Sequence, residues 1–261
     1  MAAPILPRLS LLARTAPIFT ALWLLAASVQ GDSGTSVELE LLLAVDASSS
    51  VDGTEFELQI QGIANAFRDP SVLRAIIDTG QQGIAVSVMQ WSGGGRQDLT
   101  VNWTRVYDID SAARLSETIA AMPRVVPGGD TSLRGAIRYA TRQFDDNGLT
   151  GARKVIDISG DGGAIRFGVG TPNEARDEAV ARHITINGLA ILNEVPNLDS
   201  YYAEHVIGGA GAFVMTAADY DDFGNAIIRK LIQEIGERPI AEGSPPDERE
   251  AAPAAQSADR F

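Results

Sequence analysis

A short polar segment near the start of the chain has the side chains to bind a cation. Its sequence, DASSS over residues 46–50, places oxygen-bearing side chains at the alternating positions 46, 48 and 50. Two further oxygen donors lie far downstream, each in a glycine-rich stretch. The candidate ligands are therefore two carboxylates and three hydroxyls: Asp46, Ser48, Ser50, Thr131 and Asp161.

This set of donors has a definite chemical preference. It offers oxygen alone, and oxygen ligands suit hard cations such as Mg²⁺, Mn²⁺ or Ca²⁺. Zinc, which favours nitrogen and sulfur ligands, is a poor match. The chain contains no cysteine, which excludes disulfides, thiolate catalysis, zinc–thiolate sites and iron–sulfur clusters. The sequence thus predicts a site for a hard divalent cation.

The hydrophobic pattern predicts the elements that position these ligands. Nearly continuous apolar runs indicate buried strands at residues 39–45, 84–91, 154–159, 184–191 and 212–215. Residues 99–103 are expected to add a further strand, for which an antiparallel edge is one option. Apolar residues at helical spacing predict helices over 56–67, 133–144 and 223–235.

Strands that alternate with helices give the fold class: α/β, a doubly wound, mostly parallel sheet of about six strands with helices on both faces. Asp52 and Glu55 have the spacing of a capping box at the start of the first helix. In such sheets, ligands bind beyond the carboxyl ends of the strands, where the strand order reverses. Asp46 and Asp161 each follow a predicted strand, so we expect them to meet there.

The ordered pattern Asp46-x-Ser48-x-Ser50, Thr131, Asp161-Gly162 on an α/β chain resembles the von Willebrand factor type A domain, whose signature is a metal-ion-dependent adhesion site. The resemblance covers residues 37–235. It implies that the serines and the threonine bind a metal directly or through water, while the aspartates complete the shell partly through water. The segments at 55–59 and 66–70 also look like an uncharacterised bacterial family of secreted proteins of this type, which implies no activity.

Two positions depart from that pattern. Ser49 stands where a glycine is frequent, and Gly160 stands where the family usually has Thr or Ser. Neither is a proposed ligand, but a hydroxyl at position 160 would support the ligands from behind, and such outer partners tune metal affinity. We therefore expect a modest affinity.

Local backbone structure offers a simpler interpretation of the same residues. Asp46 and Ser50 could cap the helix that follows them, and Thr131 could cap the helix that begins near Leu133. Asp161 lies between glycines and could serve only a turn. The coincidence of all five positions favours the metal site over these separate explanations.

Three functions compete for such a site. The favoured one is non-enzymatic: a partner protein offers an Asp or Glu carboxylate, which takes a water's place on the metal. A metal-dependent phosphatase similar to the haloacid dehalogenases would use Asp46 as nucleophile, but Ser48 stands where that family has a second acid. The third function is a binding scaffold whose metal is purely structural. No phosphate-binding Gly-x-Gly-x-x-Gly follows the first strand.

Charge and chain ends bear on partners and location. With 21 basic and 34 acidic residues the net charge is -13, which argues against nucleic acids and anionic lipid surfaces as partners. Residues 1–31, with two arginines before an apolar run, predict a signal peptide and an exported, periplasmic or extracellular protein without membrane insertion; a retained anchor is the alternative. Residues 32–240 form the predicted domain and 241–261 a disordered tail. The oligomeric state stays open.

Overall fold

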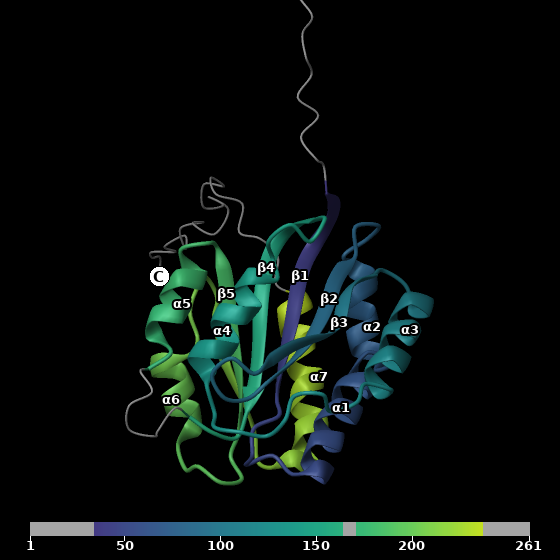
Figure 1. Ribbon diagram of the computed structural model, residues 1–261. Coiled ribbons are helices and arrows are strands. Elements are labelled where there is room, and N and C mark those ends of the chain that lie inside the picture. The colour runs from purple at the N-terminus through teal and green to yellow at the C-terminus, as the bar shows by residue number, and fades with distance from the viewer. Residues whose placement is uncertain (1–33, 164–170, 237–261) are drawn as a thin grey trace, which may run out of the picture. The chain divides into compact units, whose positions relative to one another are not determined.

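A computed structural model describes residues 34–163 and 171–236 (Figure 1). The predicted signal peptide at 1–31 and the predicted tail at 241–261 lie outside the described residues. Within the described ranges, no helix has the length and apolar character needed to cross a bilayer.

A six-stranded sheet forms the centre of the described region, in the order β3-β2-β1-β4-β5-β6. All neighbouring strands are parallel except β2 and β3, which are antiparallel, so β3 is an antiparallel edge strand. The predicted α/β fold with about six strands is confirmed. The strands are β1 (Thr35–Asp46), β2 (Ile84–Trp91), β3 (Gln97–Val106), β4 (Leu149–Gly160), β5 (Ile184–Ile191) and β6 (Val214–Ala217).

Helices cover both faces of the sheet (Figure 1). One apolar core joins the sheet to α1, α2, α3 and α7, and a second core joins the opposite face to α4, α5 and α6. The helices are α1 (Gly53–Ala66), α2 (Pro70–Asp78), α3 (Ile109–Ala120), α4 (Leu133–Arg142), α5 (Asn173–Val180), α6 (Leu198–His205) and α7 (Tyr220–Gly236).

The elements lie where the apolar pattern predicted them, but several strands are longer: β1 begins at Thr35 and β4 at Leu149, and β3 spans Gln97–Val106. The capping box is confirmed, since Asp52 accepts a hydrogen bond from the Glu55 amide at 2.9 Å and Glu55 accepts one from the Asp52 amide at 2.8 Å. The helix predicted over 133–144 ends at Arg142, and Phe144 packs into the core from the turn beyond it. The last strand lies two residues later than predicted, at Val214–Ala217.

Sheet order places the candidate ligands together. The chain passes from β1 to β2 on one side and returns to β4 on the other, so the strand order reverses between β1 and β4. Ala44 of β1 pairs with Ile158 of β4, which puts Asp46 level with Gly160 and next to Asp161. Both carboxylates therefore lie at the carboxyl edge of the sheet, at the switch point where α/β proteins bind ligands.

A buried group of charges ties α7 to the sheet. Lys230 Nζ lies 2.8 Å from Asp157 Oδ1 of β4 and 2.5 Å from Glu234 Oε1, and all three side chains are almost completely buried. Asn187 of β5 donates a further hydrogen bond to Glu234 at 2.9 Å. Burial and the neighbouring Asp157 raise the pKa of Glu234, and Lys230 partly opposes this. The lysine is thus the cation that makes two buried acids tolerable.

Replacing that cation should destabilise the fold strongly. We expect Lys230→Met to lower the free energy of unfolding by about 3–5 kcal/mol, because removing one partner leaves buried charges uncompensated. Guanidinium chloride unfolding at pH 8 measures the change. Arg229→Met, on the exposed side of the same helix, is the matched control and should have an effect of about 0.5 kcal/mol or less. Equal stability of the two variants would contradict this role for Lys230.

Candidate metal site

Four of the five candidate ligands are connected by hydrogen bonds. The Asp46 carboxylate accepts a bond from the Ser48 amide at 2.7 Å, and the Ser48 and Ser50 hydroxyls lie 3.0 Å apart. Ser50 donates to Asp161 Oδ1 at 2.8 Å, across 111 positions of sequence. The loop after β1 and the end of β4 thus meet through their side chains, as the motif predicted.

The fifth candidate, Thr131, borders the same cluster. A Cβ built on Gly162 would lie 3.4 Å from the Thr131 hydroxyl oxygen, so this hydroxyl lies against the residue that follows Asp161. Thr131 sits in the segment between α3 and α4. The structure therefore brings all five predicted residues to one place.

The capping interpretation of these residues is wrong. Asp52 caps α1, and the cap of α4 is Ser132, whose hydroxyl accepts a hydrogen bond from the Gly135 amide at 3.2 Å. Asp46, Ser50 and Thr131 are therefore not the N-caps of these two helices. Their shared location needs another explanation.

Two buried carboxylate oxygens have no partner among the residues that the structure describes. These atoms are Asp46 Oδ2 and Asp161 Oδ2, and neither side chain is exposed to solvent. A buried polar atom without a partner is costly, so native proteins rarely keep one without a reason. A divalent cation would supply that reason, and the oxygen-only donor set fits a hard cation.

The hydroxyls are essential to this fit. No group of three or more His, Asp or Glu side chains gathers within residues 34–163 and 171–236. The two aspartates alone would make a poor cage, and Ser48, Ser50 and Thr131 supply the remaining protein oxygens. Such a site leaves coordination positions for water, because Mg²⁺ needs six ligands and usually keeps several waters.

Burial raises the pKa of Asp46 from about 3.8 to about 7. The hydrogen bonds from Ser48 lower this pKa, Asp161 raises it, and Arg124 lowers it slightly. Without a cation, the buried carboxylate therefore holds a proton well above the pH at which an exposed aspartate loses it. A bound cation favours the ionised form and would displace that proton.

Arg124 supports the loop of the candidate site, and sequence reasoning missed it. Its guanidinium donates to the carbonyl oxygens of Ala47 at 2.9 Å and Ser48 at 3.0 Å, and it lies over the Phe56 ring at 5.2 Å from the centroid. These bonds hold the loop that carries the serines. Arg124 lies in an irregular segment more than 70 positions downstream, and nothing in its neighbourhood marks this contact.

The loop that contains Gly128 and Gly129 contacts the serine segment from the other side. The Ser49 amide donates to the Gly129 carbonyl at 3.0 Å, and Arg96 donates to the Gly128 carbonyl at 2.7 Å. A Cβ on Gly128 would lie 3.0 Å from the Ser49 hydroxyl. The serine at position 49, where a glycine is frequent, is thus accommodated by a glycine on the loop that faces it.

Two tyrosine hydroxyls lie behind the carboxylates. Tyr202 of α6 and Tyr220 of α7 are buried, and a side-chain contact with Asp161 is among the causes that raise the pKa of Tyr220. Burial raises the pKa of both phenols, and the charges of Asp46 and Asp161 raise them further. The sequence analysis assigned no role to either residue.

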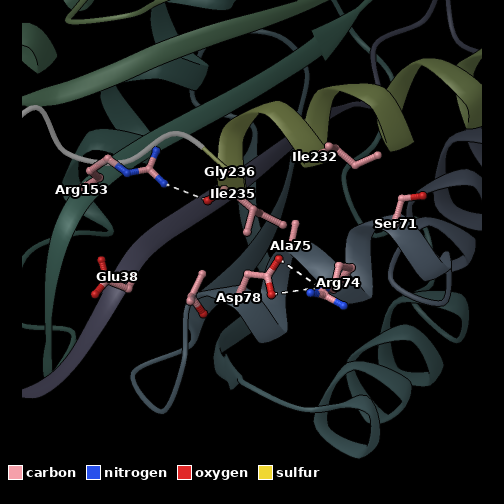
Figure 2. A pocket seen from close by; sticks show the side chains of 10 residues that line it. Glu38, Ser71, Arg74, Ala75, Asp78, Arg153, Ile232, Ile235 and Gly236 are labelled. Carbon is pink, nitrogen blue, oxygen red and sulfur yellow. Dashed lines mark hydrogen bonds and ion pairs between the residues drawn. The ribbon is translucent and has the colours of Figure 1, made fainter. Parts of the chain in front are cut away.

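A hollow of about 720 Å³ lies at the opposite end of the sheet (Figure 2). It is bordered by Glu38 near the start of β1, by α2 and by the end of α7. Arg74 and Asp78, which line it, pair with each other at 3.0 Å. None of the five candidate ligands lines this hollow, so it is separate from the candidate metal site.

Comparison with known proteins supports the family and the fold. Residues 36–239 match the family described as "Protein of unknown function (DUF1194)". A comparison with curated proteins gives no match. The predicted relation to an uncharacterised family is thereby confirmed.

Solved structures resemble the chain over more than three quarters of its length. One is proximal thread matrix protein 1 from the mussel byssus, in a structure described as having a zinc-occupied metal-ion-dependent adhesion motif: TM-score 0.58, 13% identity, 78% of this chain and 49% of that one. Another is the pilus adhesin SpaC from Lactobacillus rhamnosus GG, with a TM-score of 0.53 and 13% identity over 78% of this chain and 31% of that one. A third is von Willebrand factor type A from Catenulispora acidiphila, with a TM-score of 0.50 and 18% identity over 77% of this chain and 43% of that one.

These likenesses confirm the von Willebrand factor type A fold. At such low identities they show the fold alone, and the chain spans about half or less of the length of these three structures. What the site of this chain binds must therefore be argued from its own residues.

The raised pKa of Asp46 predicts that, without metal, the ionised Asp46 carboxylate lowers the stability of the fold. The unfolded chain releases the Asp46 proton near pH 4, whereas the folded protein keeps it up to about pH 7, so the contribution of Asp46 to stability falls as the pH rises through that range. With EDTA present, we expect Asp46→Asn to be more stable than the natural protein at pH 8 by about 1–3 kcal/mol, and we expect this difference to be clearly smaller at pH 5.

Guanidinium chloride unfolding of both proteins at the two pH values measures this difference. The asparagine keeps the acceptor for the Ser48 amide, so it removes the charge with little change of shape. A stability gap that is the same at pH 5 and pH 8 would show that the burial of the Asp46 charge is not its source.

Proposed function

We propose that this chain, which belongs to the family described as "Protein of unknown function (DUF1194)", is a non-enzymatic, metal-dependent protein-binding domain. In this proposal a divalent cation at the site binds an Asp or Glu side chain of a partner protein. One observation carries the proposal: among the described residues, Asp46 Oδ2 and Asp161 Oδ2 are buried without a hydrogen-bond partner, beside the hydroxyls of Ser48 and Ser50.

The site residues divide between holding the cation and supporting it. Ser48, Ser50 and Thr131 would offer their hydroxyls, while Asp46 and Asp161 would complete the shell partly through water. The cation supplies positive charge and an exchangeable coordination position. Its two charges balance the two aspartates, so a third carboxylate is not opposed by an uncompensated negative site, even in a chain of net charge -13.

The cation we favour is Mg²⁺, with Mn²⁺ and Ca²⁺ as substitutes, because the donors are all oxygens. The zinc in the mussel protein's structure makes Zn²⁺ a further metal to test. Two of the similar structures are described as a pilus adhesin and a thread matrix protein, which supports a role in protein interaction and a location outside the cytoplasm. We place this protein in the periplasm or outside the cell.

Titration calorimetry after EDTA treatment tests the metal site. The natural protein should bind Mg²⁺ and Mn²⁺, and metal at 100 times its Kd should stabilise the fold by about 2.7 kcal/mol. Asp46→Ala should abolish binding. Ser50→Ala should weaken it less, because it removes one neutral oxygen instead of a charge. Absence of binding to the natural protein would overturn the site, and equal losses in the two variants would contradict this ranking.

Water-proton relaxation of the Mn²⁺-loaded protein tests the open coordination position. An exchangeable water on the metal should enhance relaxation strongly, and an excess of a glutamate-containing peptide should reduce the enhancement. The same peptide with glutamine is the matched control and should leave it unchanged. A metal-loaded protein without enhancement would point instead to a purely structural metal.

A further inference from the structure

Gly160 is the position at which the chain lacks a hydroxyl that similar domains usually carry. Other side chains lie very close to the place where its side chain would be. A Cβ built on Gly160 would lie 2.7 Å from Asp46 Oδ2 and 2.9 Å from the Tyr202 hydroxyl oxygen. Trp91 closes a third side at 3.3 Å. The space that a serine or threonine would need at position 160 is therefore already occupied by a carboxylate oxygen and a phenol.

The Tyr202 ring reaches this place through a slot formed by two glycines. Gly160 ends β4, and Gly188 lies on the neighbouring strand β5, where a Cβ would come within 2.6 Å of Tyr202 Cδ1. Since Ile158 pairs with Gly188 in the sheet, the two glycines lie close together under α6. A side chain at either glycine would displace the ring.

Two unpartnered polar atoms meet at the end of this slot. Tyr202 and Asp46 are both completely buried, and neither the phenol oxygen nor Asp46 Oδ2 has a hydrogen-bond partner within the described part of the chain. Both atoms lie within 3 Å of one point, the Cβ position built on Gly160. A phenol keeps its proton at neutral pH, so the Tyr202 hydroxyl is available as a hydrogen-bond donor.

We propose that Tyr202 takes over the supporting role of the hydroxyl missing at position 160. The described residues form no hydrogen bond between the Tyr202 hydroxyl and Asp46 Oδ2. With a cation bound, the Tyr202 O–H would donate to one lone pair of Asp46 Oδ2 and leave the other lone pair for the cation or its water. Together with the bond from the Ser48 amide to Oδ1, it would fix the plane of the carboxylate. Tyr202 is a positioning residue and not itself a ligand. This inference rests on the metal site proposed above.

The role has a consequence for affinity. Partners that hydrogen-bond a metal ligand from behind orient it, and their loss typically costs 10-fold to 100-fold in metal affinity. Tyr202→Phe keeps the ring in the slot and removes only the donor. We therefore expect Tyr202→Phe to weaken Mg²⁺ binding about 10-fold.

The experiment is calorimetric titration of EDTA-treated full-length protein with Mg²⁺, accompanied by the melting temperature of each metal-free protein. Tyr202→Phe should bind about 10-fold more weakly, while its metal-free melting temperature stays the same or rises, because the hydroxyl it loses has no partner before metal binds. Tyr201→Phe, the same change on the next residue of α6, is the matched control and should bind as the natural protein does.

The outcomes separate this inference from the proposed function. If the natural protein binds no metal, the metal site itself fails. If it binds and Tyr202→Phe binds equally well, the metal site stands and the role of Tyr202 is overturned. A loss of affinity accompanied by an equally large fall in metal-free stability, or shared by Tyr201→Phe, would also overturn it, because the effect would then be a general loosening of α6.

Discussion

The central constraint on this structure is that two carboxylates are buried side by side at the carboxyl edge of a parallel sheet. Asp46 ends β1 and Asp161 follows β4, and the strand order makes these two strands neighbours. Bringing two acids out of water at one place is unfavourable unless something compensates for it. The surrounding loops provide hydrogen bonds that partly offset this cost. Ser50 donates to Asp161, and the Ser48 amide donates to Asp46. Arg124 donates to the carbonyl groups of Ala47 and Ser48 in the loop that carries the serines.

The sequence was sufficient to predict the fold and the meeting of the five candidate residues at one place, because both depend on strong, regular signals. Continuous apolar runs marked the buried strands, and β2 and β5 have the predicted bounds. Asp46 and Asp161 lie where β1 and β4 end, so placing these strands also placed the two carboxylates. The helix over 133–144 was predicted too long because Phe144 continues the apolar spacing, although it packs from a turn.

The supporting residues could not be predicted in the same way. Arg124 donates to carbonyl groups more than 70 positions away, and Tyr202 of α6 lies against glycines of two other elements, β4 and β5. No periodicity or motif around either residue marks those contacts. Gly160 shows the limit most clearly. The sequence analysis treated it as the loss of a hydroxyl and expected modest affinity, whereas the structure has a phenol from α6 against the same point. A missing group at one position carries little information until the surrounding side chains are known.

A comparison within β4 and the residue beyond it supports a cation from outside the chain. Asp157 and Asp161 lie four residues apart, and both are almost completely buried. Asp157 is neutralised by Lys230, which lies 2.8 Å away and which also serves Glu234. Asp161 and Asp46 receive only hydrogen bonds from neutral groups, and no described lysine or arginine forms an ion pair with either. Among the described residues, Lys230 thus serves the acid in the middle of the strand, and no lysine or arginine forms an ion pair with the two acids at its end. Burying a carboxylate costs free energy at both places. A cation from solution would therefore offset this cost at the end of the strand, as Lys230 does in its middle.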